Sequence, residues 1–377
     1  MEKCAVSKYC GGCQYQGIDY MEQLKKKQNY VNSLLNKFNK VNDILGMNDY
    51  THYRNKVQVS FGYDDYKHVI VGNYVTSSHM IVPIDDCMIA DQKANEIINS
   101  IKRLVIKYKI SIFDEYVYKG CLRHVLIRCN NNDEYMVVLV TGSTMFRNIE
   151  PFLKDLLKFN PCVKTVVQNI NNAHTSMILG DKNIVLYGKG YIYEKLCGLS
   201  FRVSPSSFFQ VNKRQTEVLY NQALKAADLK GNETIIDAYC GTGTIGLIMA
   251  NKAKRVIGVE INKDAVKDAI NNSKNNNITN AEFICDDASD YMYKAAKNKH
   301  FFDLLIMDPP RSGADLKFLK AVLTLKPKKI VYVSCNPETL RDNLNVLKND
   351  YKVKNIQPVD MFPFTNHVEC VVGMQRK

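Results

Sequence analysis

The sequence predicts an α/β protein whose C-terminal part, residues 201–377, forms a parallel, doubly wound sheet. Three observations lead to this prediction and to the division of the rest of the chain. After residue 201, strand-like segments alternate with helical ones, as in a parallel sheet covered by helices on both faces. Residues 46–200 are rich in strands and include a helical stretch, which is typical of an α+β domain. The start of the chain is rich in cysteine and glycine, so we expect residues 1–45 to form a separate segment.

The composition is that of a globular protein with several domains. The chain has 377 residues, of which 46% are hydrophobic and 24% are charged, enough for two or three domains and a sizeable core. No segment reaches the roughly 18 apolar residues of a membrane span, and the N-terminus lacks the apolar core of a signal peptide. We therefore expect a cytoplasmic protein without membrane association. The net charge of +13 favours a polyanionic partner, although a proteome rich in Lys and Asn would give the same bias.

Four cysteines of the first two segments are candidate metal ligands. Cys4, Cys10 and Cys13 form a C-x5-C-x2-C pattern, and Cys87 follows an acidic pair further along the chain. Cytosolic proteins rarely pair their cysteines as disulfides, and four thiolates bind either zinc or an iron–sulfur cluster. The spacing alone leaves both metals open.

Hydrophobic periodicity predicts the elements of these two segments. Residues 20–38 place apolar side chains at helical spacing with lysines on the other face, as in an amphipathic helix. Val57, Val59 and Phe61 alternate with polar residues, as in a half-buried strand. Further along, the pattern predicts a hairpin, a helix and a strand, at 123–142, 149–159 and 163–170.

Five strands are predicted in the C-terminal part, and most of them are followed by a helical segment. They are "TIIDAYC", "RVIGVEI", "AEFICDD", "FDLLIMDPP" and "KIVYVSC". The first ends in Asp237 and a glycine-rich turn with Gly241 and Gly243, where the backbone can approach a ligand closely. The second ends in Glu260, a position from which a carboxylate can hold two ribose hydroxyls.

A glycine-rich turn alone is weak evidence, since it also occurs for steric reasons or in nicotinamide-binding Rossmann folds. The turn, the acidic end of the second strand and "CDDA" on the third together resemble the S-adenosylmethionine site of class I (Rossmann-like) methyltransferases. This resemblance implies Tyr239 and Thr244 around the methionine part, Glu260 at the ribose and Asp287 near the adenine. Thr244 departs from the Asn common at its position, and its hydroxyl cannot reproduce the bonding of an amide.

The fourth and fifth strands end in residues suited to methylating carbon. A D-P-P turn is shared with enzymes that methylate exocyclic amino groups, in which an aromatic residue usually follows. Here Arg311 follows Asp308-Pro309-Pro310, and the next strand ends at Cys335. The combination of D-P-P-R with S-C-N-P separates carbon methylation from nitrogen methylation.

The chemistry explains why a thiol is needed. C5 of uracil is a poor nucleophile, and a thiolate that adds at C6 makes C5 reactive. We expect Cys335 to be this nucleophile, with Arg311 favouring the thiolate and Asp308, grouped with the cofactor site, able to bond the uracil edge. Glu369, near His367 in "HVEC", can remove the C5 proton. The alternatives are a buried structural cysteine and a surface glutamate.

From Cys4 to Glu369, the chain is similar to the RNA 5-methyluridine methyltransferases of the RumA/RlmD, RlmC and TrmA group. The shared motifs are "FFQVN", "DAYCGTGTIGL", "DPPRSG", "SCNPETL" and "HVEC". The resemblance implies Gln210 as a further cofactor contact and Glu369 as the base. Some relatives carry an N-terminal oligonucleotide-binding barrel, the TRAM domain. This chain begins at the cysteine cluster, so we expect it to lack that barrel.

The cysteine pattern also carries a resemblance, since "C-x5-C-G-G-C" with a later Cys87 is similar to the [4Fe–4S] site of the RumA-type branch. TrmA-type tRNA enzymes lack this cluster, which favours 23S rRNA as the substrate. We therefore expect a cytoplasmic, monomeric enzyme that transfers methyl from S-adenosylmethionine to C5 of a uridine in 23S rRNA. The cluster would fold the N-terminal segment and shape a surface that contacts RNA.

Three alternatives remain open at this stage: methylation of the T-loop of tRNA, methylation of two rRNA sites, and a non-catalytic RNA-binding assembly factor. In each enzymatic case the target base must be flipped out or single-stranded to reach the thiol. We expect the central domain to bind RNA. Basic residues there and in the helix at 20–38 would hold phosphates, and "SSFFQ" could supply an aromatic platform.

Overall fold

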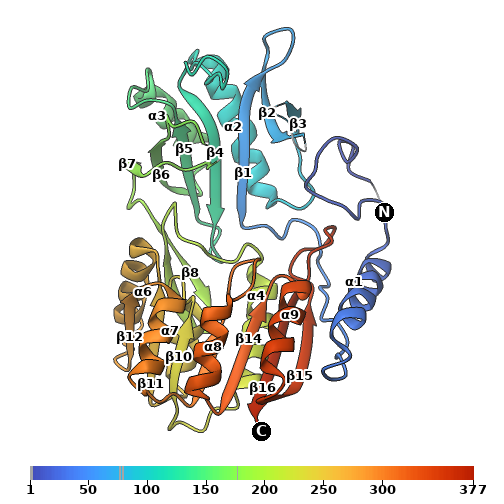
Figure 1. The fold of residues 1–377 in the computed structure, drawn as a ribbon. Helices are drawn as coiled ribbons and strands as arrows, with labels where there is room; N and C mark the ends of the chain where they lie inside the picture. The colour runs from blue at the N-terminus through green and yellow to red at the C-terminus, as the bar shows by residue number, and fades with distance from the viewer. Residues whose placement is uncertain (1–2, 76–77, 79, 176) are drawn as a thin grey trace. The chain divides into compact units, whose positions relative to one another are not determined.

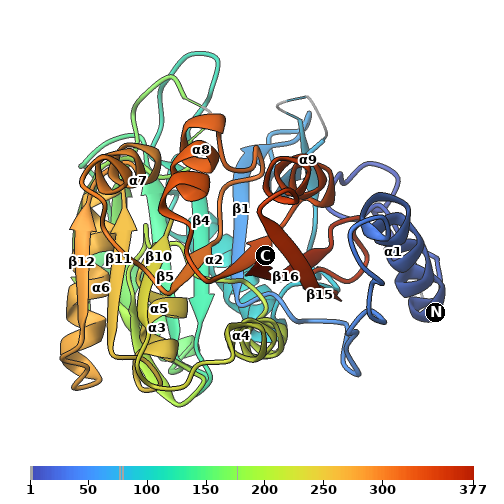
Figure 2. The same ribbon diagram turned by 60° about the horizontal axis from the view of Figure 1, so that its bottom comes forward.

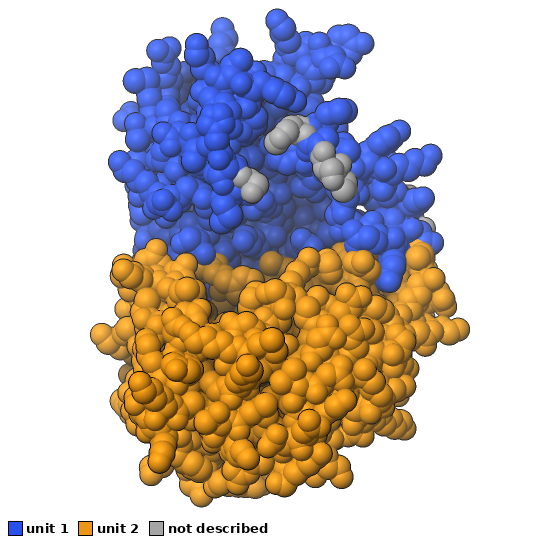
Figure 3. Space-filling model, in the orientation of Figure 1, with its two compact units in different colours: residues 1–17, 49–194, 203–206 blue, residues 18–48, 195–202, 207–377 orange. Residues whose placement is uncertain are grey.

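The computed structural model describes residues 3–75, 78, 80–175 and 177–377. The chain divides into two compact units (Figure 3). Unit 1 comprises residues 1–17, 49–194 and 203–206, and unit 2 comprises residues 18–48, 195–202 and 207–377. No helix among the described residues is long and apolar enough to cross a membrane.

Unit 1 contains a seven-stranded sheet with strand order β3-β2-β1-β4-β5-β6-β7 (Figure 1). The strands are β1 (Lys56–Tyr63), β2 (Val69–Tyr74), β3 (Ile81–Pro83), β4 (Leu122–Cys129), β5 (Tyr135–Thr141), β6 (Val163–Ile170) and β7 (Lys182–Tyr187). All neighbours are antiparallel except β5 and β6, which are parallel because α3 connects them. The predicted hairpin is present as β4 and β5.

Two helices complete the core of unit 1, namely α2 (Gln92–Lys107) and α3 (Ile149–Phe159). Val57, Val59 and Phe61 share a buried cluster with apolar residues of both helices. The alternation seen in the sequence therefore marks the sheet face that packs against helices.

Unit 2 contains a second seven-stranded sheet, with strand order β12-β11-β10-β13-β14-β16-β15. The strands are β10 (Thr234–Ala238), β11 (Arg255–Glu260), β12 (Ala281–Cys285), β13 (Leu304–Met307), β14 (Lys329–Ser334), β15 (Tyr351–Val359) and β16 (Glu369–Arg376). Strands β8 (Ile192–Leu196) and β9 (Leu199–Val203) form a separate two-stranded sheet.

Helices cover both faces of the unit 2 sheet, as Figure 2 shows: α7, α8 and α9 lie on one face, and α4, α5 and α6 lie on the other. These helices are α4 (Lys213–Ala227), α5 (Thr244–Ala250), α6 (Lys263–Asn275), α7 (Ala288–Lys297), α8 (Leu316–Leu325) and α9 (Pro337–Leu347). The predicted α/β architecture with a doubly wound sheet is confirmed.

The sheet is mixed rather than wholly parallel, and this corrects the prediction. Strands β10 to β14 are mutually parallel, whereas β16 is antiparallel to both β14 and β15. Parallel neighbours need a crossover connection, usually a helix. No helix lies between β15 and β16, so these two strands pair directly as an antiparallel hairpin.

Helix α1 (Tyr20–Leu35) belongs to unit 2, although the sequence grouped it with the cysteine-rich segment. Val31 and Leu35 share a buried cluster with Leu340 and Leu344 of α9. Figures 1 and 2 both show α1 beside α9 and β15. Residues 1–17, in contrast, cluster with unit 1. The division into domains at 45 and 200 stays a prediction.

Candidate active site

One cavity of about 660 Å³ in unit 2 lies where β10, β11, β13 and β14 end. Ligands of open α/β sheets bind at this carboxyl edge. All eight predicted cofactor and catalytic residues line the cavity: Gln210, Tyr239, Thr244, Glu260, Asp287, Asp308, Cys335 and Glu369. The structure therefore brings together residues that span 160 positions in the sequence, from 210 to 369.

The glycine-rich turn after β10 is held by Asp237. Gly246 N donates to Asp237 Oδ2 at 2.8 Å, and the other carboxyl oxygen, Oδ1, is buried without a hydrogen-bond partner. Burial raises the pKa of Asp237 to about 7, and Asp308 and Glu260 add to this rise while the bond from Gly246 opposes it. A buried acceptor without a donor suits a ligand that carries a cationic or hydrogen-bonding group.

Glu260 and Asp287 use part of their carboxyl groups to hold the protein backbone. Gly241 N donates to Glu260 Oε2 at 3.0 Å, and Asn262 N donates to Oε1 at 2.8 Å. Asp287 caps α7 through Oδ1, which accepts from the backbone N–H groups of the helix's first turn. Each carboxylate oxygen has more than one acceptor position, so both residues can still accept ligand hydroxyl or amino groups.

Tyr239 and Thr244 lie on opposite sides of the turn. Tyr239 has a positive φ of 65°, and its ring centroid lies 5.3 Å from that of Phe318 on α8. Thr244 Oγ1 lies 3.3 Å from the hydroxyl of Tyr220 on α4. Tyr220 also lines the cavity and is buried, and the sequence did not single it out because it looked like a core position of an amphipathic helix.

The turns after β13 and β14 are tied to each other. Asn336 Nδ2 and Thr339 Oγ1 both donate to the carbonyl of Arg311, at 3.1 Å and 3.2 Å. Asn336 also caps α9 by accepting from Glu338 N. The "SCNPET" stretch therefore fixes the D-P-P-R turn beside Cys335, a role that the sequence did not reveal.

Cys335 and Glu369 meet at the end of the β14·β16 ladder. Ser334 pairs with Cys370 in this antiparallel register. Cys335 follows Ser334, and Glu369 precedes Cys370, so the two side chains come from facing positions at the carboxyl edge of β14. The antiparallel direction of β16 delivers Glu369 to the cavity.

The environment keeps protons on both groups. Burial raises the pKa of Cys335 to about 11, with Glu369 and Asp308 adding to the rise. Burial and Asp308 raise the pKa of Glu369 to about 8, and burial raises that of Asp308 to about 7. Arg311 lowers the pKa of Cys335 as expected, but burial and the carboxyl groups outweigh it.

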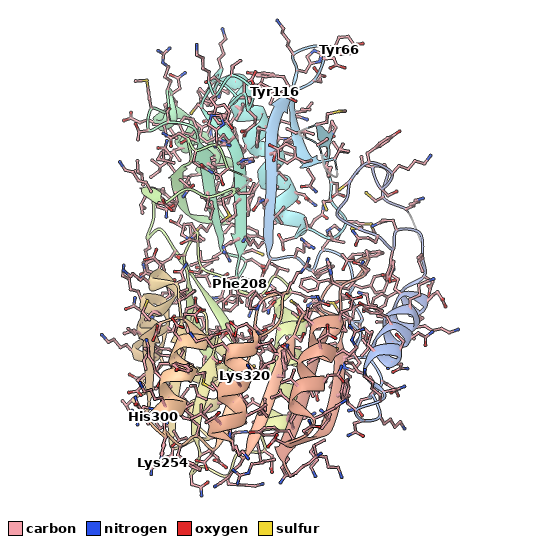
Figure 4. The ribbon with its side chains drawn as sticks, viewed as in Figure 1. Tyr66, Tyr116, Phe208, Lys254, His300 and Lys320 are labelled. Carbon is pink, nitrogen blue, oxygen red and sulfur yellow. The ribbon has the colours of Figure 1, made fainter. Side chains whose placement is uncertain are left out.

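Aromatic and basic groups complete the cavity wall. Arg311 Nη2 donates to His367 Nε2 at 3.0 Å, and the ring of His367 meets that of Phe362 edge-on. Of the two phenylalanines in "SSFFQ", Phe209 is buried while Phe208 is 70% exposed. Phe208, labelled in Figure 4, lies on the chain between β9 and α4. It also lines the cavity.

The four cysteines of the predicted cluster all belong to unit 1 and are free, partly buried thiols. Burial raises the pKa of Cys13 to about 11 and also raises that of Cys87. In both cases neighbouring cysteines of the set add to the rise, so the thiols lie within electrostatic range of one another. Within the described part of the chain, however, no three Cys, His, Asp or Glu side chains are grouped closely enough to hold a metal.

Comparison with known proteins identifies the family. The family described as tRNA (Uracil-5-)-methyltransferase matches residues 19–377. This chain belongs to the RNA uracil-5-methyltransferase family. The match includes all of α1 and every residue that lines the cavity.

Relatives of this uracil-5-methyltransferase extend over nearly its whole length. An uncharacterized RNA methyltransferase from Oceanobacillus iheyensis is 43% identical, over 98% of this chain and 82% of the relative. One from Staphylococcus aureus (strain MSSA476) is 39% identical, over 98% of this chain and 83% of the relative.

A solved structure shares the fold. It is the Pyrococcus abyssi tRNA (uracil-54, C5)-methyltransferase in complex with S-adenosyl-L-homocysteine, with a TM-score of 0.80 and 29% identity, over 98% of this chain and 86% of that one. Together these similarities show an S-adenosylmethionine-dependent RNA uracil-5-methyltransferase. The unpartnered Asp237 oxygen and the carboxyl groups in the cavity fit a cofactor that carries ammonium, sulfonium and hydroxyl groups.

Proposed function

We propose that this enzyme methylates C5 of a specific uridine in 23S rRNA through a covalent bond between Cys335 and C6 of the base. The observation that carries the proposal is the convergence of Cys335, Glu369, Asp308 and Arg311 in the cavity formed by the glycine-rich turn. A structural cysteine would not need two carboxyl groups and a guanidinium in the same cavity.

Cys335 starts the reaction. Its sulfur, as the thiolate, forms a bond to C6, and the electrons of the C5=C6 double bond move to C5 and the O4 carbonyl. Arg311 opposes the effect of the carboxyl groups on this thiol and so favours the thiolate. C5 would then be nucleophilic enough to take the methyl group from the sulfonium of S-adenosylmethionine, with the S–CH3 bond breaking and S-adenosylhomocysteine leaving.

Glu369 ends the reaction. Its carboxylate removes the proton from C5, the C5=C6 double bond forms again, and the bond from C6 to Cys335 breaks to release the thiolate. Glu369 must therefore be ionised when the base is methylated. Its raised pKa means that it loses its proton near pH 8, within reach of neutral conditions.

The remaining predicted residues would hold the cofactor and the base. We propose Gln210, Tyr239, Thr244, Glu260, Asp287 and Asp308 for S-adenosylmethionine, with Asp308 also placed to bond the uracil edge. When bound, S-adenosylmethionine supplies an electrophilic methyl group. A cationic ligand also stabilises the ionised forms of nearby carboxyl groups, which would lower the pKa values that are raised in the free cavity.

We also propose a [4Fe–4S] cluster on Cys4, Cys10, Cys13 and Cys87. Other cysteines of the set raise the pKa of Cys13 and of Cys87, which supports the proposal, although no three of the described side chains are grouped closely enough to hold a metal as they stand. Four thiolates suit iron–sulfur or zinc. The methylation steps do not need it, so its proposed role is to order the first 17 residues and form an RNA-contacting surface. Anaerobic purification should give visible absorbance and iron that are lost in C13S. If the purified protein contains zinc and no iron, the proposed cluster is wrong and the four cysteines form a zinc site.

The choice of 23S rRNA rests on the cysteine pattern, and tRNA is the second candidate. The observation that favours tRNA is the similarity to the Pyrococcus abyssi tRNA enzyme over 98% of this chain. We place the enzyme in the cytoplasm, in keeping with twelve cysteines that form no disulfide, and we propose that it is a monomer.

Two experiments test the proposal. RNA containing 5-fluorouridine should trap a complex of the wild-type enzyme that survives denaturation, because fluorine at C5 cannot leave as a proton, and C335A should trap none. Mass-spectrometric mapping of 5-methyluridine in a deletion strain should show loss from 23S rRNA. Loss from tRNA alone would overturn the substrate assignment, and absence of a trapped complex would overturn the covalent mechanism.

A further inference from the structure

Helix α1 buries polar side chains where an amphipathic helix normally buries apolar ones. Tyr20, Gln23 and Lys27 repeat at helical spacing, and all three are buried, with Lys27 only 1% exposed. Lysine is almost never this deeply buried unless it is paired. The partners of these side chains therefore show what the helix face does.

All three side chains hold the same short segment, residues 360–368, which connects β15 to β16. Lys27 Nζ donates to Asp360 Oδ1 at 2.6 Å and to the carbonyl of Phe362 at 3.0 Å. Tyr20 donates from its hydroxyl to Asp360 Oδ2 at 2.9 Å, and Gln23 Oε1 accepts from Phe364 N at 2.8 Å.

Helix α4 holds the same segment as well. Gln215 Nε2 donates to the carbonyl of Asp360 at 3.0 Å, and Asn212 Nδ2 donates to that of Met361 at 2.9 Å. The backbone from Asp360 to Phe364 is thus fixed by side chains of two helices.

This segment leads directly into the active site. Phe362 lines the cavity, His367 accepts a hydrogen bond from Arg311, and Glu369 follows as the first residue of β16. Helix α1 also contacts α9, which begins two residues after Cys335. Burial and a hydrogen bond to Glu338, in the first turn of α9, raise the pKa of Tyr30 on α1. One helix therefore contacts both the segment that leads to the carboxyl group and the helix that follows the thiol.

The buried ion pair is a costly way to attach a helix. Both side chains are 0% exposed, and replacing such a pair by apolar residues of similar volume is often neutral or stabilising. Burial lowers the pKa of Lys27 in spite of Asp360. An ion pair does, however, fix direction and distance, which apolar packing does not.

We infer that Lys27 is a positioning residue for Glu369: through Asp360 and the Phe362 carbonyl it sets the path of residues 360–368, and so the place where the carboxylate meets the C5 proton. This inference rests on the proposed function. It assigns to α1, far from the methyltransferase motifs in the sequence, a part in the proton-removal step.

The test uses the full-length enzyme and the variant K27M, with E22Q as the control because Glu22 is an exposed charged residue on the same helix. Misplacing the base slows its step, so K27M should lower kcat roughly 100-fold while the KM for RNA and for S-adenosylmethionine stays within about twofold. Because release from Cys335 needs the base, K27M should accumulate denaturation-resistant enzyme–RNA complex on ordinary RNA, as E369Q should. E22Q should do neither.

A second variant separates positioning from stability. K27M alone leaves Asp360 buried without its cation, and K27M/D360N removes both charges, so the double variant should regain thermal stability. If Lys27 is only structural, turnover should recover together with stability. If it positions Glu369, the stable double variant should still accumulate the complex. When K27M does not fold, the double variant carries the test.

The outcomes are distinguishable. Failure of E369Q to accumulate any complex would contradict the proposed function of Glu369. Suppose instead that E369Q accumulates the enzyme–RNA complex, whereas folded K27M or K27M/D360N turns over normally and accumulates none. This result would overturn the role of Lys27 and leave the proposed function intact.

Discussion

At the end of the β14·β16 ladder, burial raises the pKa of the Cys335 thiol and of the Glu369 and Asp308 carboxyl groups. Asp308 adds to the rise at Cys335 and Glu369, and Glu369 adds to the rise at Cys335. Two carboxyl groups and a thiolate cannot all be charged cheaply in a buried space. The free cavity therefore holds protons that the reaction needs to remove. Positive charge lowers these pKa values. Arg311 supplies such charge within the protein, and the cofactor would supply more when it is bound.

These protonation states predict the pH dependence of the rate. Below pH 8 Glu369 is mostly protonated in the free enzyme, and the thiol of Cys335 stays protonated to about pH 11. The proposed mechanism needs both groups without their protons, so kcat/KM should rise through pH 8 and still be rising at about pH 9. R311M should shift the profile to higher pH. A profile that is flat from about pH 6 to 9 would contradict this account.

The same carboxyl group predicts how stability depends on pH. The pKa of Glu369 is about 8 in the folded protein and near its ordinary value of 4.5 in the unfolded chain. Between these values the folded state holds a proton that the unfolded chain releases, so stability should fall as the pH rises through this range. E369Q lacks this effect.

The measurement is a melting temperature at two pH values. Relative to wild type, E369Q should gain several degrees between about pH 5 and pH 8.5. The variant E338Q, at an exposed position, serves as the control and should show no such gain. If the melting temperatures of E369Q and wild type change equally between the two pH values, burial does not raise the pKa of this carboxyl group.

At the scale of elements, the glycine-rich turn depends on the absence of a side chain in α5. A Cβ at Gly246 would lie 2.8 Å from Asp237 Oδ2 and 3.0 Å from Val256 Cγ1. G246A should therefore displace the carboxyl group that Gly246 N now holds, and weaken S-adenosylmethionine binding by about tenfold or more. Calorimetry or equilibrium dialysis measures the affinity. If G246A binds S-adenosylmethionine with unchanged affinity, Asp237 does not contribute to the cofactor site.

Motifs in the sequence predicted residues that line one cavity, but they did not predict all of the elements that hold these residues. The eight cavity residues were predicted because each lies in a short stretch with a chemical purpose, such as the turn after β10 or the D-P-P-R turn. Tyr220 and Phe362 were not, because nothing local distinguishes a tyrosine in α4 from a core residue. The antiparallel entry of β16 was missed because pairing direction depends on which strands become neighbours in space. The grouping of α1 with unit 2 was missed for the same reason, since Lys27 meets Asp360 only in the folded chain.

At the scale of the whole molecule, the net charge of +13 is distributed over many exposed side chains, among them Lys254 and Lys320 (Figure 4). Phosphate contacts release counterions, so RNA affinity should fall steeply with salt. Between 50 and 200 mM salt we expect a loss of roughly tenfold or more, measured by filter binding.

The variant F208A provides the contrast. Stacking does not release counterions, so loss of this exposed ring should weaken RNA binding by about 1–3 kcal/mol without changing the slope of log affinity against log salt. A changed slope in F208A would contradict the stacking role of Phe208, and an RNA affinity that does not depend on salt would contradict the phosphate contacts.

The late position of β16 has a consequence for synthesis of the chain. The ribosome completes Cys335 well before Glu369, and the strand that carries the carboxyl group cannot join the sheet until it has emerged. Under the proposed chemistry, a chain that ends before β16 has a nucleophile but no base to free it, and its sheet lacks the buried strand between β14 and β15, so we expect no turnover from it. Insertion of this strand between β14 and β15 is the event that makes the enzyme able to turn over.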